Sequence, residues 1–161
     1  MTIQEVIVKN LNLFNEQLKQ TLDKKNITDT GNAKKSIEIE NNSNANTYIF
    51  SSIGADYIEI LNSGRRSGKR PPIAVLEKWV QSKLGISNAQ QRKQVAFAVA
   101  NKIAKEGTNI FKNPSQGLEV EKLVFELNNR LANDLPKAAK FEFDLKLDEF
   151  TKKFAREKLF K

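Results

Sequence analysis

Apolar residues recur at steps of three and four in four stretches of the chain, the spacing that places them on one face of an α-helix. Proline, glycine or a capping residue bounds each stretch. The first stretch has Thr2 followed by Glu5, a pair that fits a capping box at a helix start. The pattern therefore predicts helices over about residues 2–24, 71–84, 88–106 and 118–135, the last ending at Pro136.

Alternation of polar and apolar residues predicts a β-hairpin between the first two helices. Residues 36–40 alternate, as in a strand with one buried face. The asparagine-rich run 41–46 cannot continue that strand because asparagine favours turns, so residues 47–53 are expected to return as its partner. A short helical turn is expected at residues 33–36, and residues 56–61 fit either a helix or a strand.

After Pro136, polar and apolar residues alternate again, and further along the apolar residues recur at helical spacing. We interpret this part of the chain as a strand followed by a basic terminal helix, forming an extension that contacts other subunits. Removing residues 137–161 is therefore expected to leave a folded core and to impair assembly. The contact residues expected in this extension are Phe141, Phe143, Leu145, Phe150 and Phe154.

These elements together predict an α+β fold. A small twisted antiparallel sheet would pack against the long N-terminal helix and two or three further helices. The expected division is a core of residues 1–135 and the extension of residues 136–161. No internal repeat is visible in the sequence.

The chain of 161 residues contains neither cysteine nor histidine. Disulfides, thiolate metal sites and histidine bases are therefore excluded, which disfavours most enzyme classes. The pairs Glu38/Glu40 and Asp144/Asp148 could hold magnesium for phosphodiester cleavage, but a solvated surface explains both pairs better. We expect no catalytic residue, no metal and no cofactor. No run approaches the ~18 apolar residues of a membrane helix, so no membrane contact is expected either.

The net charge of +8 is concentrated in the middle of the chain. Residues 60–116 carry eleven basic and two acidic side chains, whereas the remainder is close to neutral. Such a basic region suits an acidic partner, either nucleic acid or protein. A solvated lysine-rich surface is the alternative interpretation of the same charge.

The loop from Gly64 to Arg70 holds the densest group of basic residues. Three residues separate its glycines and Arg70 follows Lys69, so it lacks the spacing and the Ser or Thr of a phosphate-binding P-loop. Glycine and arginine at a helix entrance still favour a contact with an anionic group. We favour an acidic protein neighbour over DNA, because two prolines stiffen the loop. The expected contact residues are Arg65, Arg66, Lys69 and Arg70.

Two large aromatic residues have apolar or interface roles in this interpretation. Trp79 lies among Val75, Leu76 and Val80 at helical spacing, so it is expected in the core rather than on a nucleotide. Tyr57 is expected to anchor the core or an interface.

The order of these pieces resembles a known family. The chain has a long first helix, Thr30-Gly31-Asn32-Ala33-Lys34-Lys35-Ser36-Ile37, a hairpin, Ala55-Asp56-Tyr57-Ile58-Glu59, the glycine–arginine loop, Pro71-Pro72 with Trp79, and an alanine-rich helix closing at Gly107. This order, over about residues 3–114, resembles the neck or tail-completion proteins of tailed bacteriophages, the minor tail protein Z-like head–tail connectors. Two departures are the absence of glycine directly after the Tyr-x-x-Glu element and the long chain after Leu118.

The resemblance implies a structural protein of the virion that forms a ring at the portal–tail junction around the DNA path. A dodecamer is favoured over a hexamer. The implied partners are a portal or adaptor protein, tail proteins and DNA in weak nonspecific contact, first in the host cytoplasm and then in the virion. The alternative is a nucleic-acid-binding or packaging accessory protein that uses the basic loop. The resemblance also assigns signature positions to Tyr57, Glu59, Gly64, Pro71, Pro72 and Trp79.

Overall fold

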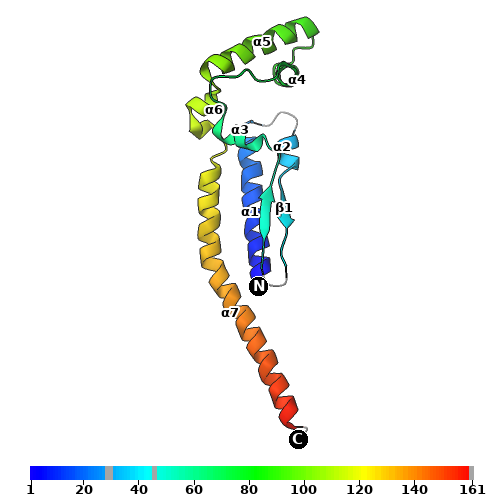
Figure 1. Cartoon of the computed structure of the whole chain (residues 1–161), viewed down its shortest axis with the longest axis vertical. Coiled ribbons are helices and arrows are strands. Elements are labelled where there is room, and N and C mark those ends of the chain that lie inside the picture. Colours follow the sequence, from blue (N-terminus) through cyan, green and yellow to red (C-terminus); the bar gives the residue numbers. More distant parts are fainter. Residues whose placement is uncertain (28–30, 45–46, 160–161) are drawn as a thin grey trace. The chain divides into compact units, whose positions relative to one another are not determined.

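The computed structural model describes residues 1–27, 31–44 and 47–159 (Figure 1). The fold class is α+β, as the pattern predicts, with one two-stranded antiparallel sheet among helices. The elements are α1 (Ile3–Lys24), α2 (Asn32–Lys35), β1 (Glu38–Asn41), β2 (Phe50–Ile53), α3 (Ile58–Ser63), α4 (Ile73–Leu84), α5 (Ala89–Glu106), α6 (Asn109–Lys112), a 3₁₀ turn (Pro114–Gln116) and α7 (Val120–Leu159).

The chain divides into two compact units. The first unit consists of Met1–Asn15, Ile39–Ser52 and Lys122–Lys161, and the second consists of Glu16–Glu38 and Ile53–Glu121. Residues far apart in sequence therefore form each unit.

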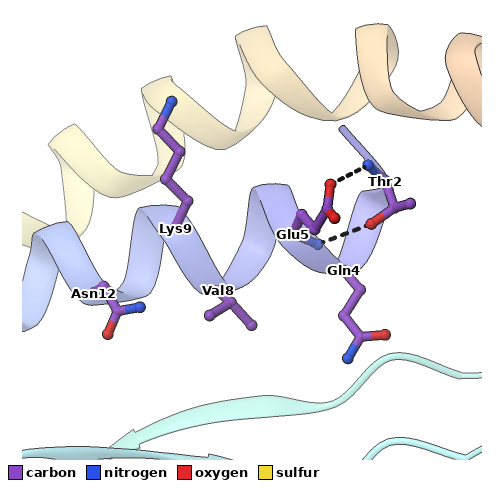
Figure 2. A pocket seen from close by; sticks show the side chains of 6 residues that line it. All are labelled: Thr2, Gln4, Glu5, Val8, Lys9 and Asn12. Carbon is purple, nitrogen blue, oxygen red and sulfur yellow. Dashed lines mark hydrogen bonds between the residues drawn. The ribbon is translucent and has the colours of Figure 1, made fainter.

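The first unit joins the start of α1 to the β-hairpin on one side and to α7 on the other (Figure 1). Its buried apolar residues include Val6, Leu11 and Phe14 of α1. The predicted capping box is present: Thr2 N donates to Glu5 Oε2 at 3.0 Å, and Glu5 N donates to Thr2 Oγ1 at 3.2 Å (Figure 2).

Polar contacts also bind the first unit together. Asn10 is buried, and its Nδ2 donates to Val6 O at 3.0 Å and to Asp134 Oδ2 on α7 at 3.4 Å. Ile3 N donates to Glu142 Oε1 at 2.8 Å. Ser52 Oγ of β2 donates to Asn15 Oδ1. The start of α1 therefore lies beside α7 at Glu142.

In the second unit α4 packs against α5 through Val80, Ala96 and Ala100, all of which are fully buried. Both predicted helices and their C-terminal ends are confirmed, although α4 begins at Ile73, two residues later than predicted, and α5 begins at Ala89. Gly85 ends α4 in the left-handed conformation with a φ of 66°, and Asn88 caps α5 by accepting a hydrogen bond from Gln91 N at 3.0 Å.

The predicted hairpin is also confirmed, with shorter strands than the alternation suggested. Asn42 N donates to Ile49 O at 2.9 Å, and Asn44 forms a bridge with Thr47. Regular pairing reaches only Phe50, because the partners of the preceding residues across the hairpin belong to the asparagine-rich run. Residues 45 and 46 of the predicted loop lie outside the described residues. The segment that fitted either a helix or a strand forms α3.

The prediction of a strand after Pro136 is wrong. Helix α7 continues through Pro136 and includes every residue from Val120 to Leu159. The residues around the alternating phenylalanines and leucines are mostly strong helix formers such as alanine, lysine and glutamate. Contacts with α1 on both sides of the proline, at Asp134 and Glu142, offset the backbone hydrogen bond that proline cannot make.

Candidate functional site: the basic loop

The Gly64–Arg70 loop is fastened to the junction of α5 and α6 by three backbone groups. Arg65 N donates to Thr108 Oγ1 at 2.9 Å, and Thr108 N donates to Arg65 O at 2.8 Å. Gly68 N donates to Ala104 O at 2.7 Å. The loop is thus held in one conformation by a segment about forty residues further along the chain.

Two glycines permit this close approach. Gly64 has a φ of 74°, and a Cβ on it would meet Thr108 Oγ1 at 2.7 Å and the backbone of Phe111. Gly107 has a φ of 77°, and a Cβ there would lie 2.8 Å from Arg65 O. Both positions therefore require glycine for backbone conformation and for space.

The four basic residues of the loop fall into two pairs. Arg65 is half-buried and its Nη2 donates to Lys69 O at 3.0 Å within the loop, while the Arg70 guanidinium lies 5.1 Å from the centre of the Phe97 ring on α5. Arg66 and Lys69 are exposed, and within the described part of the chain their side chains make no hydrogen bond or ion pair. Arg66 and Lys69 are thus the two basic side chains of the loop that make no such contact within the described residues.

The surroundings of the loop are positively charged. Lys102 and Lys105 are exposed on α5 close to Ala104, to which the loop is bonded. Glu106 lies 2.7 Å from Lys112 Nζ. The hydrogen bond from Lys112, its charge, and the charges of Lys102 and Lys105 lower the pKa of the Glu106 carboxyl below its ordinary value. The Glu106 carboxylate therefore interacts with lysines of the second unit.

The expected signature positions are spread over α3, the basic loop and α4 with the residues before it, all in the second unit. Tyr57 and Glu59 are exposed at the start of α3, and Pro72 caps α4 after the half-buried Pro71. The prediction that Trp79 lies in the core is wrong, because Trp79 is 36% exposed and its neighbour Val75 is 62% exposed. Apolar residues occupy more than one side of α4, and the narrow alanine face of α5 covers only the side that carries Val80.

The expected contact residues of the C-terminal segment lie on α7 instead of on a strand. Phe141, Phe143, Leu145 and Phe150 are all exposed, and the side chain of Phe154 lies outside the described residues. Phe141 also lines a cavity of about 180 Å³ together with Met1, which precedes α1, and with Val6 of α1.

The two acidic pairs lie on separate elements. Glu38 and Glu40 are exposed on β1, whereas Asp144 and Asp148 are exposed on α7, where Asp148 pairs with Lys152 Nζ at 2.6 Å. Among the described residues there is no group of three or more carboxylate, histidine or cysteine side chains that could hold a metal. In the same part of the chain, no helix is long and apolar enough to cross a membrane.

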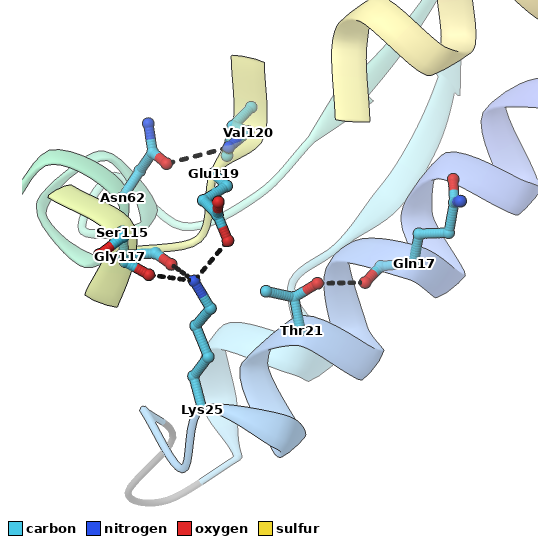
Figure 3. A network of polar contacts seen from close by, with 8 residues as sticks. All are labelled: Gln17, Thr21, Lys25, Asn62, Ser115, Gly117, Glu119 and Val120. Atoms are coloured by element: carbon cyan, nitrogen blue, oxygen red, sulfur yellow. Dashed lines mark hydrogen bonds and ion pairs between the residues drawn. The ribbon is translucent and has the colours of Figure 1, made fainter. Parts of the chain in front are cut away.

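Sequence reasoning missed two other features. Thr108 and Phe97, which position the loop, gave no sequence signal because they act only through tertiary contact. Lys25 forms a second polar network: its Nζ donates to Ser115 O at 2.6 Å and Gly117 O at 2.5 Å, and pairs with Glu119 Oε2 at 2.7 Å (Figure 3). This network joins the residue after α1 to the turn before α7.

A shallow pocket of about 750 Å³ lies along α1 (Figure 2). Its lining residues are Thr2, which caps α1, and residues of α1 itself, and its polar groups include the Thr2–Glu5 cap already described. It brings together no set of groups suited to chemistry.

Comparisons of the chain with protein-family models, with curated proteins and with solved structures gave no match.

Proposed function

We propose that the chain is a structural subunit of a ring at the head–tail junction of a tailed bacteriophage. The ring would connect the portal or an adaptor protein to the tail and surround the DNA path, and it would catalyse no reaction. The order of sequence elements described above supports the phage role.

The observation that carries the structural role is the exposed apolar surface of α7. Phe143, Leu147 and Phe150 lie on one helix and are each at least half exposed. Exposed aromatic and aliphatic side chains gathered on one element usually mark a surface that is covered by another protein.

Native mass spectrometry of the purified chain tests the ring. The expected result is one large closed assembly, a dodecamer or else a hexamer. Gene neighbours test the phage role separately, since portal and tail genes are expected beside this one. A chain that stays monomeric at all concentrations would contradict the ring.

A nucleic-acid-binding or packaging accessory protein is the second candidate function. The observation in its favour is the exposure of Arg66 and Lys69 in the same loop as Arg70, whose guanidinium lies over the Phe97 ring. Cationic side chains next to an aromatic ring suit contacts with phosphates and bases. A monomer or dimer whose DNA affinity falls steeply with salt would favour this function over the ring.

A further inference from the structure

Helix α7 continues beyond the last residue that α1 contacts by a hydrogen bond. Ile3 N donates to Glu142 Oε1, which places the first turn of α1 beside Glu142. Every residue from 143 to 153 is exposed. We call these eleven residues the distal segment. These residues extend a helix that begins at Val120, so it is their exposed apolar side chains, and not the helix itself, that a covering surface would stabilise.

The alternating pattern gives this part of α7 two apolar sides. Successive residues of an α-helix are rotated by about 100°, so residues two apart point in nearly opposite directions and residues four apart share a side. Phe141 and Leu145 therefore share one side, and Phe143 and Leu147 share the other. Phe143 is 65% exposed and Leu147 is 50% exposed.

We propose that the distal segment binds a second copy of this chain. The Phe143–Leu147 side of the segment in one copy packs against the opposite side, which carries Leu145, of the segment in its neighbour. This inference rests on the proposed ring and names the element that joins its subunits.

The two apolar sides favour a second copy as the occupant. A helix that is apolar on opposite sides is normally buried on both. One copy can then contact a different neighbour on each side, which is the type of contact that closes a ring. The exposed parts of Phe143 and Leu147 in one copy and of the opposite apolar side in its neighbour amount to roughly 400 Å², so a stable contact also has to bury the side chains that flank them on α7.

The charges of the distal segment also favour a second copy of the chain as its partner. Its six charged residues are three acidic and three basic, so the segment is neutral overall. Two copies therefore approach without net repulsion. An anionic partner such as DNA or an acidic membrane would gain no net electrostatic attraction from this segment.

Native mass spectrometry of a double variant, Phe143→Glu with Leu147→Glu, tests the assignment. Buried carboxylates at both positions would oppose association, so we expect the assembly to dissociate into single chains. The control variant is Lys146→Glu, which changes the net charge by the same two units on the same helix, and its assembly is expected to be unchanged. Circular dichroism of both variants should show the helical content of the unmodified chain.

A milder substitution gives a second measurement that does not depend on dissociation. The chain has no cysteine, so Leu147→Cys introduces one thiol. A short bismaleimide should link two copies through it, and the same reagent should link far fewer copies of Gln90→Cys, an exposed position on α5.

The outcomes separate this inference from the proposed function. A double variant that assembles like the unmodified chain, or cross-linking no stronger at Leu147→Cys than at the control, would overturn the inference and leave the ring intact. An unmodified chain that forms only dimers, with a monomeric double variant, would support the inference and refute the ring. An unmodified chain that stays monomeric would overturn both.

Discussion

Two glycines with the same φ of +74° have different surroundings. A Cβ on Gly64 would meet Thr108 Oγ1 and the backbone of Phe111, whereas a Cβ on Gly31 would have no atom within 4 Å. Gly64→Ala should therefore lower the free energy of unfolding by about 1–3 kcal/mol, and by clearly more than Gly31→Ala, which adds backbone strain alone. Urea denaturation of both variants measures the difference. Equal losses would mean that the packing of the loop on α6 does not restrict this position.

The Glu106 carboxyl provides a prediction about pH. Its pKa is lowered in the folded chain, and the hydrogen bond from Lys112 is the largest cause. The ionised Glu106 carboxylate therefore stabilises the fold at pH values above the ordinary pKa, and this stabilisation is lost as the pH falls through the lowered pKa. The effect on stability should be small because the pair is exposed. Lys112→Gln should raise the pKa of Glu106 towards its ordinary value, as measured by NMR titration of the side-chain carboxyl.

Lys105→Gln is the control for this titration, because Lys105 acts on Glu106 through charge alone and contributes least among the named causes. It should raise the pKa of Glu106 by less than Lys112→Gln does. An equal or larger rise would show that the hydrogen bond from Lys112 is not the main cause.

At the level of elements, local signals predicted α4 and α5 well and α7 poorly. Gly85 and Asn88 act on the backbone next to them, so the ends of their helices can be read from the sequence. Pro136 gives an equally strong local signal for a helix end. Contacts of Asp134 and Glu142 with α1, more than 120 residues away in sequence, override that signal.

The same contrast applies to the candidate site. The density of charge from Gly64 to Arg70 identified the basic loop before its conformation was known. Which arginines make contacts within the chain could not be predicted, because these contacts depend on Phe97 and on hydrogen bonds within the folded loop. Tertiary contacts decide which charges remain available to a partner.

The position of α1 beside α7 refines the expected effect of shortening the chain. A chain ending at Glu142 keeps the buried Ala138 and the hydrogen bond from Ile3 N, so it should unfold cooperatively with nearly unchanged stability. A chain ending at Pro136 loses both, and its free energy of unfolding should fall by roughly 2 kcal/mol or more, since a hydrogen bond to a carboxylate alone contributes about 1.5–3 kcal/mol.

Thermal and urea unfolding of the two shortened chains checks this prediction. We therefore expect the dispensable segment to begin at residue 143 instead of residue 137. Equal stability of the two shortened chains would show that residues 137–142 do not support the first unit. Loss of cooperative unfolding in the chain ending at Glu142 would show that the distal segment belongs to the folded core.

At the scale of the whole molecule, the basic loop and the assembled state lead to different expectations for DNA. A protein that surrounds a DNA path must let the duplex move, so its phosphate contacts should be weak. The loop is held by backbone hydrogen bonds to Thr108 and Ala104, and such a preorganised surface suits a fixed acidic protein better than a sliding polyanion. The second candidate function instead requires Arg66 and Lys69 to neutralise phosphates directly.

The dependence of DNA affinity on salt decides between these expectations. For duplex DNA, each neutralised phosphate contributes about −0.9 to the slope of log affinity against log salt concentration. We expect the double variant Arg66→Ser with Lys69→Ser to change that slope by less than the contribution of one phosphate contact. Lys19→Ser with Lys34→Ser is the control, since it removes the same charge from lysines paired with Glu16 and Asp23. A slope that falls by about two contacts in the loop variant alone would place the loop on DNA and favour the nucleic-acid-binding function, because only direct phosphate contacts release that number of counterions.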